Sequence, residues 1–287
     1  MMILNEEKYA RDVLTGQRDD VKSIRQKIDL ISRYNYHVLH KNDDDSYSSI
    51  VKWMEKHHDI FSEQGYSKII SDCIKKAVKR PFYHVDSVKI TKNEMDIIVS
   101  QNNLRYEKIL FVLLCMAKVQ KVSYGFDNGL ITYNITDVFK TARVSVPVDE
   151  RENILHKLLK LDLIGLPIKN DTKCLFIKFM DESDEDVVLE LNEQDCCELA
   201  YVYLKYTGKG KISRCSKCGK LIKQSKKFGD TCMDCQDSTN LKTKWCIDCG
   251  KEFQVDSRNM TKCRCDVCQR EADRIYHREY MRNRRSC

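Results

Sequence analysis

The cysteines constrain this chain more than any other feature. Nine of its 15 cysteines fall between Cys215 and Cys268, and eight of those nine form four C-x2-C pairs. The first two pairs are separated by 13 residues and the last two by 15, so two similar units follow one another at a spacing of 31 residues. In a reducing cytosol, such clustering indicates bound metal and not a disulfide framework.

Four thiolates at this spacing complete a tetrahedral structural zinc site. The glycine after the first pair of each unit, Gly219 or Gly250, allows the tight turn that brings backbone amides toward the sulfurs. A catalytic zinc keeps an open position and usually recruits histidine or a carboxylate, but no histidine lies between Cys215 and Cys268. We therefore expect two Zn2+ ions that replace a hydrophobic core in segments too short to build one. The predicted ligands are Cys215, Cys218, Cys232, Cys235, Cys246, Cys249, Cys265 and Cys268.

The ninth cysteine of the region, Cys263, has no predicted ligand role. It could substitute for Cys265, but only Cys265 keeps the C-x2-C spacing with Cys268. The motifs of common nucleic-acid enzymes are also missing: the histidines fit neither an HNH nuclease nor the His-x-His pair of a relaxase. Gly208-Lys-Gly-Lys lacks the spacing and the following Ser or Thr of a phosphate-binding loop. We expect a protein that is not an enzyme.

The positive charge of the chain is concentrated in its last third. The net charge is +7, and residues 211–287 hold 19 Lys and Arg against 10 Asp and Glu, or +9, which leaves −2 for residues 1–210. Two zinc sites with four thiolates each add about −4, so the tail keeps about +5. A basic tail favours nucleic acid as the partner.

Arginines after the last predicted zinc ligand follow a helical spacing. Arg270, Arg274, Arg278 and Arg282 recur every four residues, and Arg285 follows three later. On a helix these positions lie along one slowly drifting face, which suits phosphate oxygens. The alternative is a solvated tail whose arginines pair with neighbouring acids. We assign the five arginines to nucleic-acid binding.

Residues 1–100 predict a helical N-terminal region. Val21, Ile24, Ile28, Ile31 and Asn35 follow a 3-4 spacing, which fits either an amphipathic helix packed on its own domain or a short coiled coil, and we favour packing. Acidic residues 43–45 interrupt this pattern, a second helix is expected over 48–61, and a third starts near 67 and stops before Pro81. Thr91 and Glu94 form a capping box.

Residues 101–191 predict a winged-helix-like domain. A long apolar helix from 104 to 119, a short strand at 131–133, a helix around 135–139 and a helix opened by Asp149-x-x-Glu152 precede two strands, 174–180 and 187–191. These two strands are expected to form a hairpin with an acidic wing tip at 181–186, which would be repelled by phosphate. The third helix offers Arg151, Asn153, Lys157 and Lys160 to DNA, and contact with DNA or with protein stays open.

The remaining boundaries complete a fold that is mainly α with small β elements. A helix and linker are expected over 192–210, the first zinc ribbon over 211–240, and the second ribbon with a basic C-terminal helix over 241–287. The longest apolar run, residues 109–117, is about half of what a membrane helix needs. The N-terminus lacks the pattern of a secretory signal. We expect a cytoplasmic protein without a membrane partner.

Several motifs together resemble a known family. They are Ile90-Thr-Lys-Asn-Glu-Met, residues 110–118, Leu163-Ile-Gly, the first Cys-x2-Cys-Gly-Lys, residues 246–256, Cys263-Arg-Cys-Asp-Val-Cys and the Arg-rich ending. From about residue 80 onward the chain resembles an uncharacterised zinc-ribbon family of phages, prophages and integrated elements of Gram-positive bacteria. The resemblance implies a mobile-element context and a nucleic-acid-binding zinc ribbon, and it implies no established activity.

These observations predict a nucleic-acid-binding protein of a mobile genetic element, with DNA as the expected target, that acts in transcriptional control or replication. The alternative is a non-enzymatic adaptor that binds a host polymerase or a defence complex. RNA binding by the ribbons uses the same basic residues and is not separated from DNA binding by sequence. The oligomeric state and the target sequence stay open.

Overall fold

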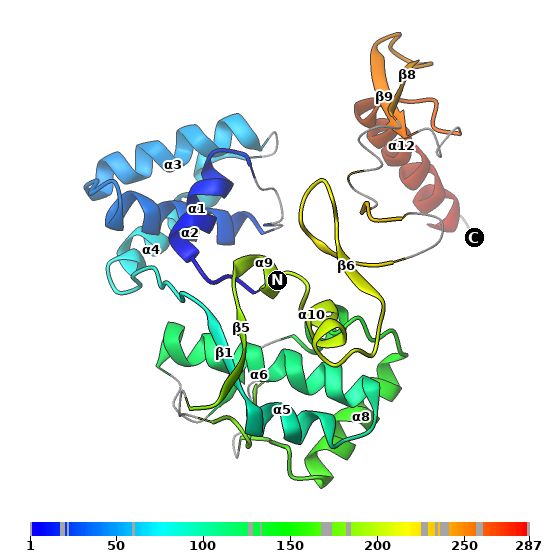
Figure 1. The fold of residues 1–287 in the computed structure, drawn as a ribbon. Helices are drawn as coiled ribbons and strands as arrows, with labels where there is room; N and C mark the ends of the chain where they lie inside the picture. Colours follow the sequence, from blue (N-terminus) through cyan, green and yellow to red (C-terminus); the bar gives the residue numbers. More distant parts are fainter. Residues whose placement is uncertain are drawn as a thin grey trace. The chain divides into compact units, whose positions relative to one another are not determined.

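In the computed structural model the chain forms two compact units, Met1–Tyr206 and Thr207–Cys287 (Figure 1). The structure describes residues 2–17, 21, 23–58, 61–125, 129–132, 134–167, 174–181, 185–224, 229–232, 235, 241–256 and 261–285. The side chains of residues 241, 256 and 279–285 are outside this description.

Four helices form the N-terminal part of unit 1: α1 (Glu6–Leu14), α2 (Ile24–His37), α3 (Asp43–His57) and α4 (Glu63–Ala77). The acidic residues Asp43, Asp44 and Asp45 do not interrupt a helix, as the sequence suggested, but form the first turn of α3. Asn42 caps that turn by accepting a hydrogen bond from the amide of Asp45 at 2.8 Å. Carboxylates are favourable there because the helix N-terminus carries partial positive charge.

The apolar face of α2 is covered within unit 1. Ile28 and Ile31 pack in one buried cluster with Ile50 and Met54 of α3 and with residues of α4. Asn35, at the position resembling a coiled-coil seam, is buried, and its amide nitrogen lies 3.3 Å from the hydroxyl of Ser46 on α3. In this structure α2 is a packed amphipathic helix.

A buried arginine ties α1 and α2 to the segment after α4. Arg33 makes two hydrogen bonds to the carboxylate of Glu6, at 2.6 and 2.5 Å. Its other donors reach the carbonyl oxygens of Arg80 and Pro81, and its guanidinium carbon lies 4.5 Å from the ring centre of Phe82. This arginine therefore fixes the path on which the chain leaves the helical part.

The longest apolar run of the sequence forms the central helix of unit 1, α6 (Leu104–Tyr124). Residues 109–115 are all fully buried, so this segment of the helix is covered on every side, while Val122 and Tyr124 near its end are exposed. Asn103 caps its start, and Gly125 ends it in the left-handed conformation. Tyr203 of α10 (Leu199–Tyr206) donates a hydrogen bond to buried Glu107 at 2.8 Å, which joins α10 to α6.

Two small antiparallel sheets accompany α6. One has the strand order β2-β4-β3, from β2 (Leu130–Thr132), β4 (Cys174–Ile177) and β3 (Ile164–Gly165). The other pairs β1 (Val88–Thr91) with β5 (Val187–Leu191). The helices α5 (Lys92–Val99), α7 (Ile135–Thr141), α8 (Val148–Lys160) and α9 (Glu193–Cys196) complete the unit.

The predicted hairpin between residues 174–180 and 187–191 is therefore wrong. β4 is the middle strand of its sheet and has both edges occupied, while β5 places Leu191 and Leu189 opposite Val88 and Ile90 of β1. β4 and β5 do not pair with each other because β2 and β3 occupy both edges of β4, while β1 is the partner of β5. Residues 181–186 connect two sheets and are not a wing tip, and 182–184 are outside the described residues.

The carboxylate of Glu94 links the start of α5 to α6 and to the segment that follows β4. Glu94 is fully buried, and its capping box with Thr91, predicted from the sequence, is present at the start of α5. Its side chain also pairs with Lys118 of α6 at 2.8 Å and accepts a hydrogen bond from the amide of Asp181. The second predicted box is absent: α8 begins at Val148 after Pro147 without a side-chain cap, and Asp149 lies inside the first turn.

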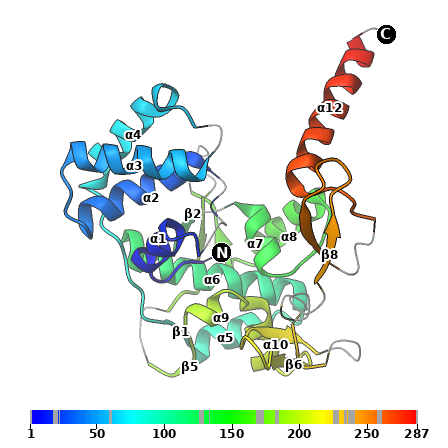
Figure 2. The same ribbon diagram turned by 90° about the horizontal axis from the view of Figure 1, so that it is seen from above.

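The described residues of unit 2 form two short hairpins and the helix α12 (Asp266–Arg285). β6 (Ile212–Arg214) pairs with β7 (Leu221–Lys223), and β8 (Leu241–Trp245) pairs with β9 (Glu252–Asp256). The helix α12 follows the second hairpin and extends from it (Figure 2). Over the described parts of both units, no helix is long and apolar enough to cross a membrane.

Candidate metal centres

Each hairpin of unit 2 ends in a turn that carries two cysteines. Arg214 pairs with Leu221 and Trp245 with Glu252, so both turns close across the same seven-residue interval. Gly219 and Gly250 follow the second cysteine of each turn with φ values of 74° and 66°. Their amides donate to the carbonyl oxygens of Cys215 and Cys246, each at 2.9 Å. Glycine suits this left-handed turn, as the sequence predicted.

The turns assemble the eight predicted cysteines into two groups of four. Within each group all four sulfurs lie within 4.8 Å of one another, and the groups are Cys215, Cys218, Cys232, Cys235 and Cys246, Cys249, Cys265, Cys268. The sulfurs of Cys218 and Cys232 are 3.5 Å apart, and those of Cys249 and Cys265 are 3.8 Å apart. Four sulfurs at about 2.3 Å from one tetrahedral ion would be about 3.8 Å apart. Both groups therefore fit a metal ion.

Backbone amides stabilise one thiolate in each group. The amide of Cys232 donates to the sulfur of Cys215 at 3.2 Å, and the amide of Cys265 donates to the sulfur of Cys246 at 3.3 Å. These bonds are the largest cause that lowers the pKa of Cys215 and of Cys246 to about 6. Both cysteines are buried, and desolvation by burial opposes this shift, so the lowered pKa values come from the hydrogen bonds and not from burial.

The last cysteine of each group shows the opposite shift. A hydrogen bond with the thiol of Cys232 is the largest cause that raises the pKa of Cys235 to about 12, and a bond with Cys265 raises that of Cys268. Four thiolates so close together repel one another, so without a cation one thiol keeps its proton. A divalent ion would remove this repulsion and hold all four as thiolates.

Cys263 lies beside the second group but outside it. It is exposed, and its carbonyl oxygen accepts a hydrogen bond from the amide of Ile247 at 3.1 Å. The second group contains Cys265 and not Cys263, in agreement with the predicted spacing. Arg264, which lies between Cys263 and Cys265 in the sequence, donates a hydrogen bond at 2.7 Å to the carboxylate of Asp248, in the turn between Cys246 and Cys249.

The basic residues after Cys268 lie on α12, as predicted. Arg270, Asp273, Arg274, His277 and Arg278 line one shallow groove on this helix. Arg274 makes an exposed ion pair with Glu271 at 3.4 Å, a contact of little energetic weight. Every side chain from Asp273 to Arg278 is exposed. The side chains of Arg282 and Arg285 are outside the described residues, although both positions belong to the helix.

The four residues predicted on the third helix of the winged-helix-like domain, which is α8, do not have equal access to a ligand. Asn153, Lys157 and Lys160 are exposed on α8. Arg151 is half-buried and donates to the carbonyl oxygen of Val146 and to the hydroxyl of Thr136, each at 3.3 Å. Arg151 thus holds the start of α8 against α7, a role that spacing alone does not reveal.

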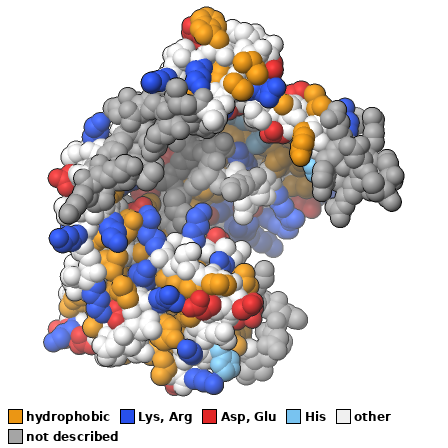
Figure 3. Space-filling model, turned by 90° about the vertical axis from the view of Figure 1, so that its right-hand side faces the viewer, with side chains coloured by type: hydrophobic (Ala, Val, Ile, Leu, Met, Phe, Trp, Pro, Cys, Tyr) orange, Lys and Arg blue, Asp and Glu red, His pale blue; other side chains and the backbone are white. Residues whose placement is uncertain are grey.

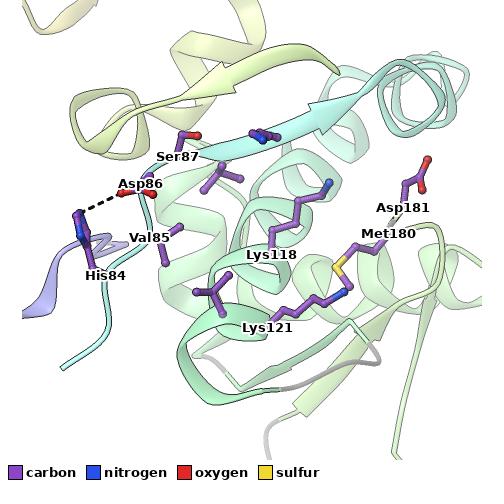
Figure 4. A pocket seen from close by; sticks show the side chains of 11 residues that line it. His84, Val85, Asp86, Ser87, Lys118, Lys121, Met180 and Asp181 are labelled. Atoms are coloured by element: carbon purple, nitrogen blue, oxygen red, sulfur yellow. Dashed lines mark ion pairs between the residues drawn. The ribbon is translucent and has the colours of Figure 1, made fainter. Parts of the chain in front are cut away.

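Unit 1 also contains a polar pocket, into which Lys118 and Lys121 project (Figure 4). Its charges are largely matched by neighbours: Lys118 pairs with Glu94, His84 lies 3.7 Å from Asp86, and Ser87 donates to Glu190. We assign no ligand to it.

Sequence reasoning missed three exposed apolar residues around the second cysteine group. Trp245, Ile247 and Val267 are 66%, 63% and 67% exposed. The available signal was their adjacency to ligands, because Trp245 and Ile247 flank Cys246 and Val267 precedes Cys268. Hydrophobic and basic side chains lie together at the top of Figure 3, where the β8–β9 hairpin is.

Comparison of the chain with family models, with curated proteins and with solved structures finds no match.

Proposed function

We propose that the chain is a zinc-loaded nucleic-acid-binding protein, with DNA as its main target, that catalyses no reaction. Zinc is the ion best suited to four thiolates in tetrahedral geometry, and the two cysteine groups match that donor set. The resemblance to a family of mobile elements further suggests a role in transcriptional control or replication.

The observation that carries this proposal is the exposed basic helix α12. Its first turn contains the ligand Cys268, so a loaded metal site would anchor one end. Most helical stability in proteins comes from packing of an apolar face, and here the side chains of residues 273–278 are all exposed, so the anchored end matters. An anchored helix with arginines at 270, 274 and 278 presents guanidinium groups to successive phosphates.

The connectivity of unit 1 supports a winged-helix interpretation of residues 101–191. The order α6, β2, α7, α8, β3, β4, with β4 between the other two strands, is the order of a winged helix. In that interpretation the wing is the connection 166–173, which contains two lysines and one aspartate. Residues 168–173 are outside the described part of the chain, but this sequence lacks the acidic repulsion expected of residues 181–186.

A DNA-reading α8 would use its exposed residues. Asn153, Lys157 and Lys160 are available, whereas Arg151 is engaged in packing. In the adaptor alternative, the same surface of α8 binds a protein. Glu152 and Asp149 favour this alternative because they reduce the positive charge of the surface. Replacing Lys157 and Lys160 by alanine should weaken DNA binding if this helix contacts DNA and leave it unchanged if the helix contacts protein.

The main experiment replaces Arg274, Arg278 and Arg282 by glutamine and measures affinity for duplex DNA, single strands and RNA across salt concentrations. Each lost phosphate contact should reduce the salt slope by close to one on duplex DNA, so we expect a slope lower by about 2 to 3 and an affinity at least several-fold weaker. The matched control replaces exposed Lys52, Lys56 and Lys75 of unit 1 by glutamine, which changes the net charge equally. Equal behaviour of both variants would refute the proposal for α12.

A further inference from the structure

The second ribbon holds an exposed tryptophan in a fixed position. Trp245 is the last residue of β8, is paired with Glu252 of β9, and directly precedes the ligand Cys246. Its backbone is thus held by a sheet on one side and by the cysteine group on the other. Nevertheless 66% of the residue is exposed to solvent.

Ile247 and Val267 lie around the same cysteine group. Each is adjacent to a ligand, and the four sulfurs of that group are within 4.8 Å of one another. The amide of Ile247 donates to the carbonyl oxygen of Cys263 at 3.1 Å. This bond holds the turn between Cys246 and Cys249 against the segment that carries Cys265. Three large apolar side chains are therefore displayed around one metal centre.

The first ribbon shows that this frame does not need apolar residues at its surface. Its hairpin has the same interval between strands and the same glycine turn, but Arg214 and Ser216 occupy the positions of Trp245 and Ile247. Both residues of the first ribbon are exposed. The apolar side chains of the second ribbon are thus a property of its surface and not a requirement of its fold.

The register of β8 and β9 places Trp245 on an open sheet face. Thr243 and Gln254 are cross-strand partners on that face, and both are exposed. The opposite face carries Val255, which is buried, and Phe253, which is half-buried. An aromatic ring beside polar side chains can stack on a base while its neighbours bond to base edges.

Charge favours nucleic acid over other occupants of this surface. Residues 241–287 hold 12 Lys and Arg against 7 Asp and Glu, or +5, and a four-thiolate zinc site would leave about +3. Lys242 of β8 and Lys251, which directly precedes β9, are both exposed. Stacking requires an unpaired base, because a duplex hides its base faces.

We propose that Trp245, supported by Ile247 and Val267, is a stacking platform for unpaired nucleotides of single-stranded nucleic acid. This inference rests on the proposed nucleic-acid function and assigns its substrate class. Trp245 and its two neighbours contact bases, and the arginines of α12 contact phosphates.

The test uses the full-length, zinc-loaded protein with oligothymidylate, oligouridylate of equal length and a duplex of mixed sequence. Trp245→Ala should weaken binding to single strands by about 5-fold to 100-fold, the range expected for loss of one stacked base, and change duplex binding less than about 2-fold. Trp245→Phe should retain most of the affinity. The oligothymidylate and oligouridylate arms separate DNA from RNA. Zinc content and circular dichroism check that each variant is folded.

Fluorescence supplies a second readout. The chain has two tryptophans, and Trp53 is half-buried in unit 1, so the difference between wild type and Trp245→Phe isolates Trp245. Oligothymidylate should quench the fluorescence of Trp245, which is measured as this difference.

The possible failures are distinguishable. Unchanged single-strand affinity in Trp245→Ala, with weaker binding by the arginine variant, overturns the platform and leaves the proposed function standing. Equal losses on duplex and single strands also overturn it. A wild-type protein that binds no oligonucleotide overturns both proposals, and loss of a co-purifying host protein in Trp245→Ala would then identify the surface as a protein contact.

Discussion

Unit 1 and unit 2 are held together by different means. Unit 1 surrounds the fully buried segment 109–115 with helices and two sheets. In the described part of unit 2 only five residues are buried, and three of them are the cysteines Cys215, Cys232 and Cys246, with Leu221 and Val255 as the other two. Unit 1 has a large apolar core, and we propose that unit 2 depends instead on metal–ligand bonds, because a metal site supplies folding free energy that two buried aliphatic residues cannot.

Substitution of a cysteine ligand should give the largest loss of structure, and this loss should be confined to unit 2. We expect Cys246→Ser to unfold the second ribbon and to lower the zinc content to about one ion per chain, while unit 1 keeps its thermal transition. Hydrogen exchange followed by mass spectrometry locates the change. Cys263→Ser is the control and should keep both ions. Unfolding of unit 1 by Cys246→Ser would refute the separation of the two units.

A cavity in α6 should give the converse result. Leu113→Ala removes a fully buried side chain and should destabilise unit 1 by about 2 to 5 kcal/mol. Denaturant unfolding measures this loss, and the zinc content should stay unchanged. Val122→Ala on the same helix is 59% exposed in the wild type and should cost less than about 0.5 kcal/mol. A similar cost for both substitutions would mean that α6 is not the core helix.

The capping box at the start of α5 should give a smaller effect. Thr91→Ala removes the acceptor for the amide of Glu94 and should cost about 1 kcal/mol. Thr91→Ser keeps the acceptor and is the matched control. A neutral Thr91→Ala would show that Glu94 alone, through Lys118 and the amide of Asp181, holds this corner.

The thiols should also react differently in the two units. Burial raises the pKa of Cys196 to about 12, so this thiol stays protonated near neutral pH. After metal removal, the cysteines of the unfolded unit 2 should alkylate before Cys196, and because the thiolate is the reacting form, their rates should fall from pH 7.5 to pH 5. Alkylation followed by mass spectrometry at pH 5 and 7.5 measures the order. Equally fast modification of Cys196 would contradict it.

Spacing rules made the two four-cysteine groups predictable, because C-x2-C followed by glycine determines a local turn. The apolar run of α6 and the capping box of Thr91 were predictable for the same reason, since each depends on nearby residues. The sheet pairing was not: β3 has only two residues, and β5 pairs with β1, about 100 residues away. Arg151 and Trp245 were misjudged or missed because their exposure depends on tertiary contacts that periodicity does not encode.

Native mass spectrometry of the full chain, before and after treatment with a chelator and combined with hydrogen exchange, tests whether bound metal holds unit 2 together. We predict two zinc ions per chain, and we predict that their removal abolishes protection in unit 2 while residues 109–115 keep theirs. Fewer than one zinc ion in properly folded protein, or a unit 2 that stays protected without metal, would contradict the account.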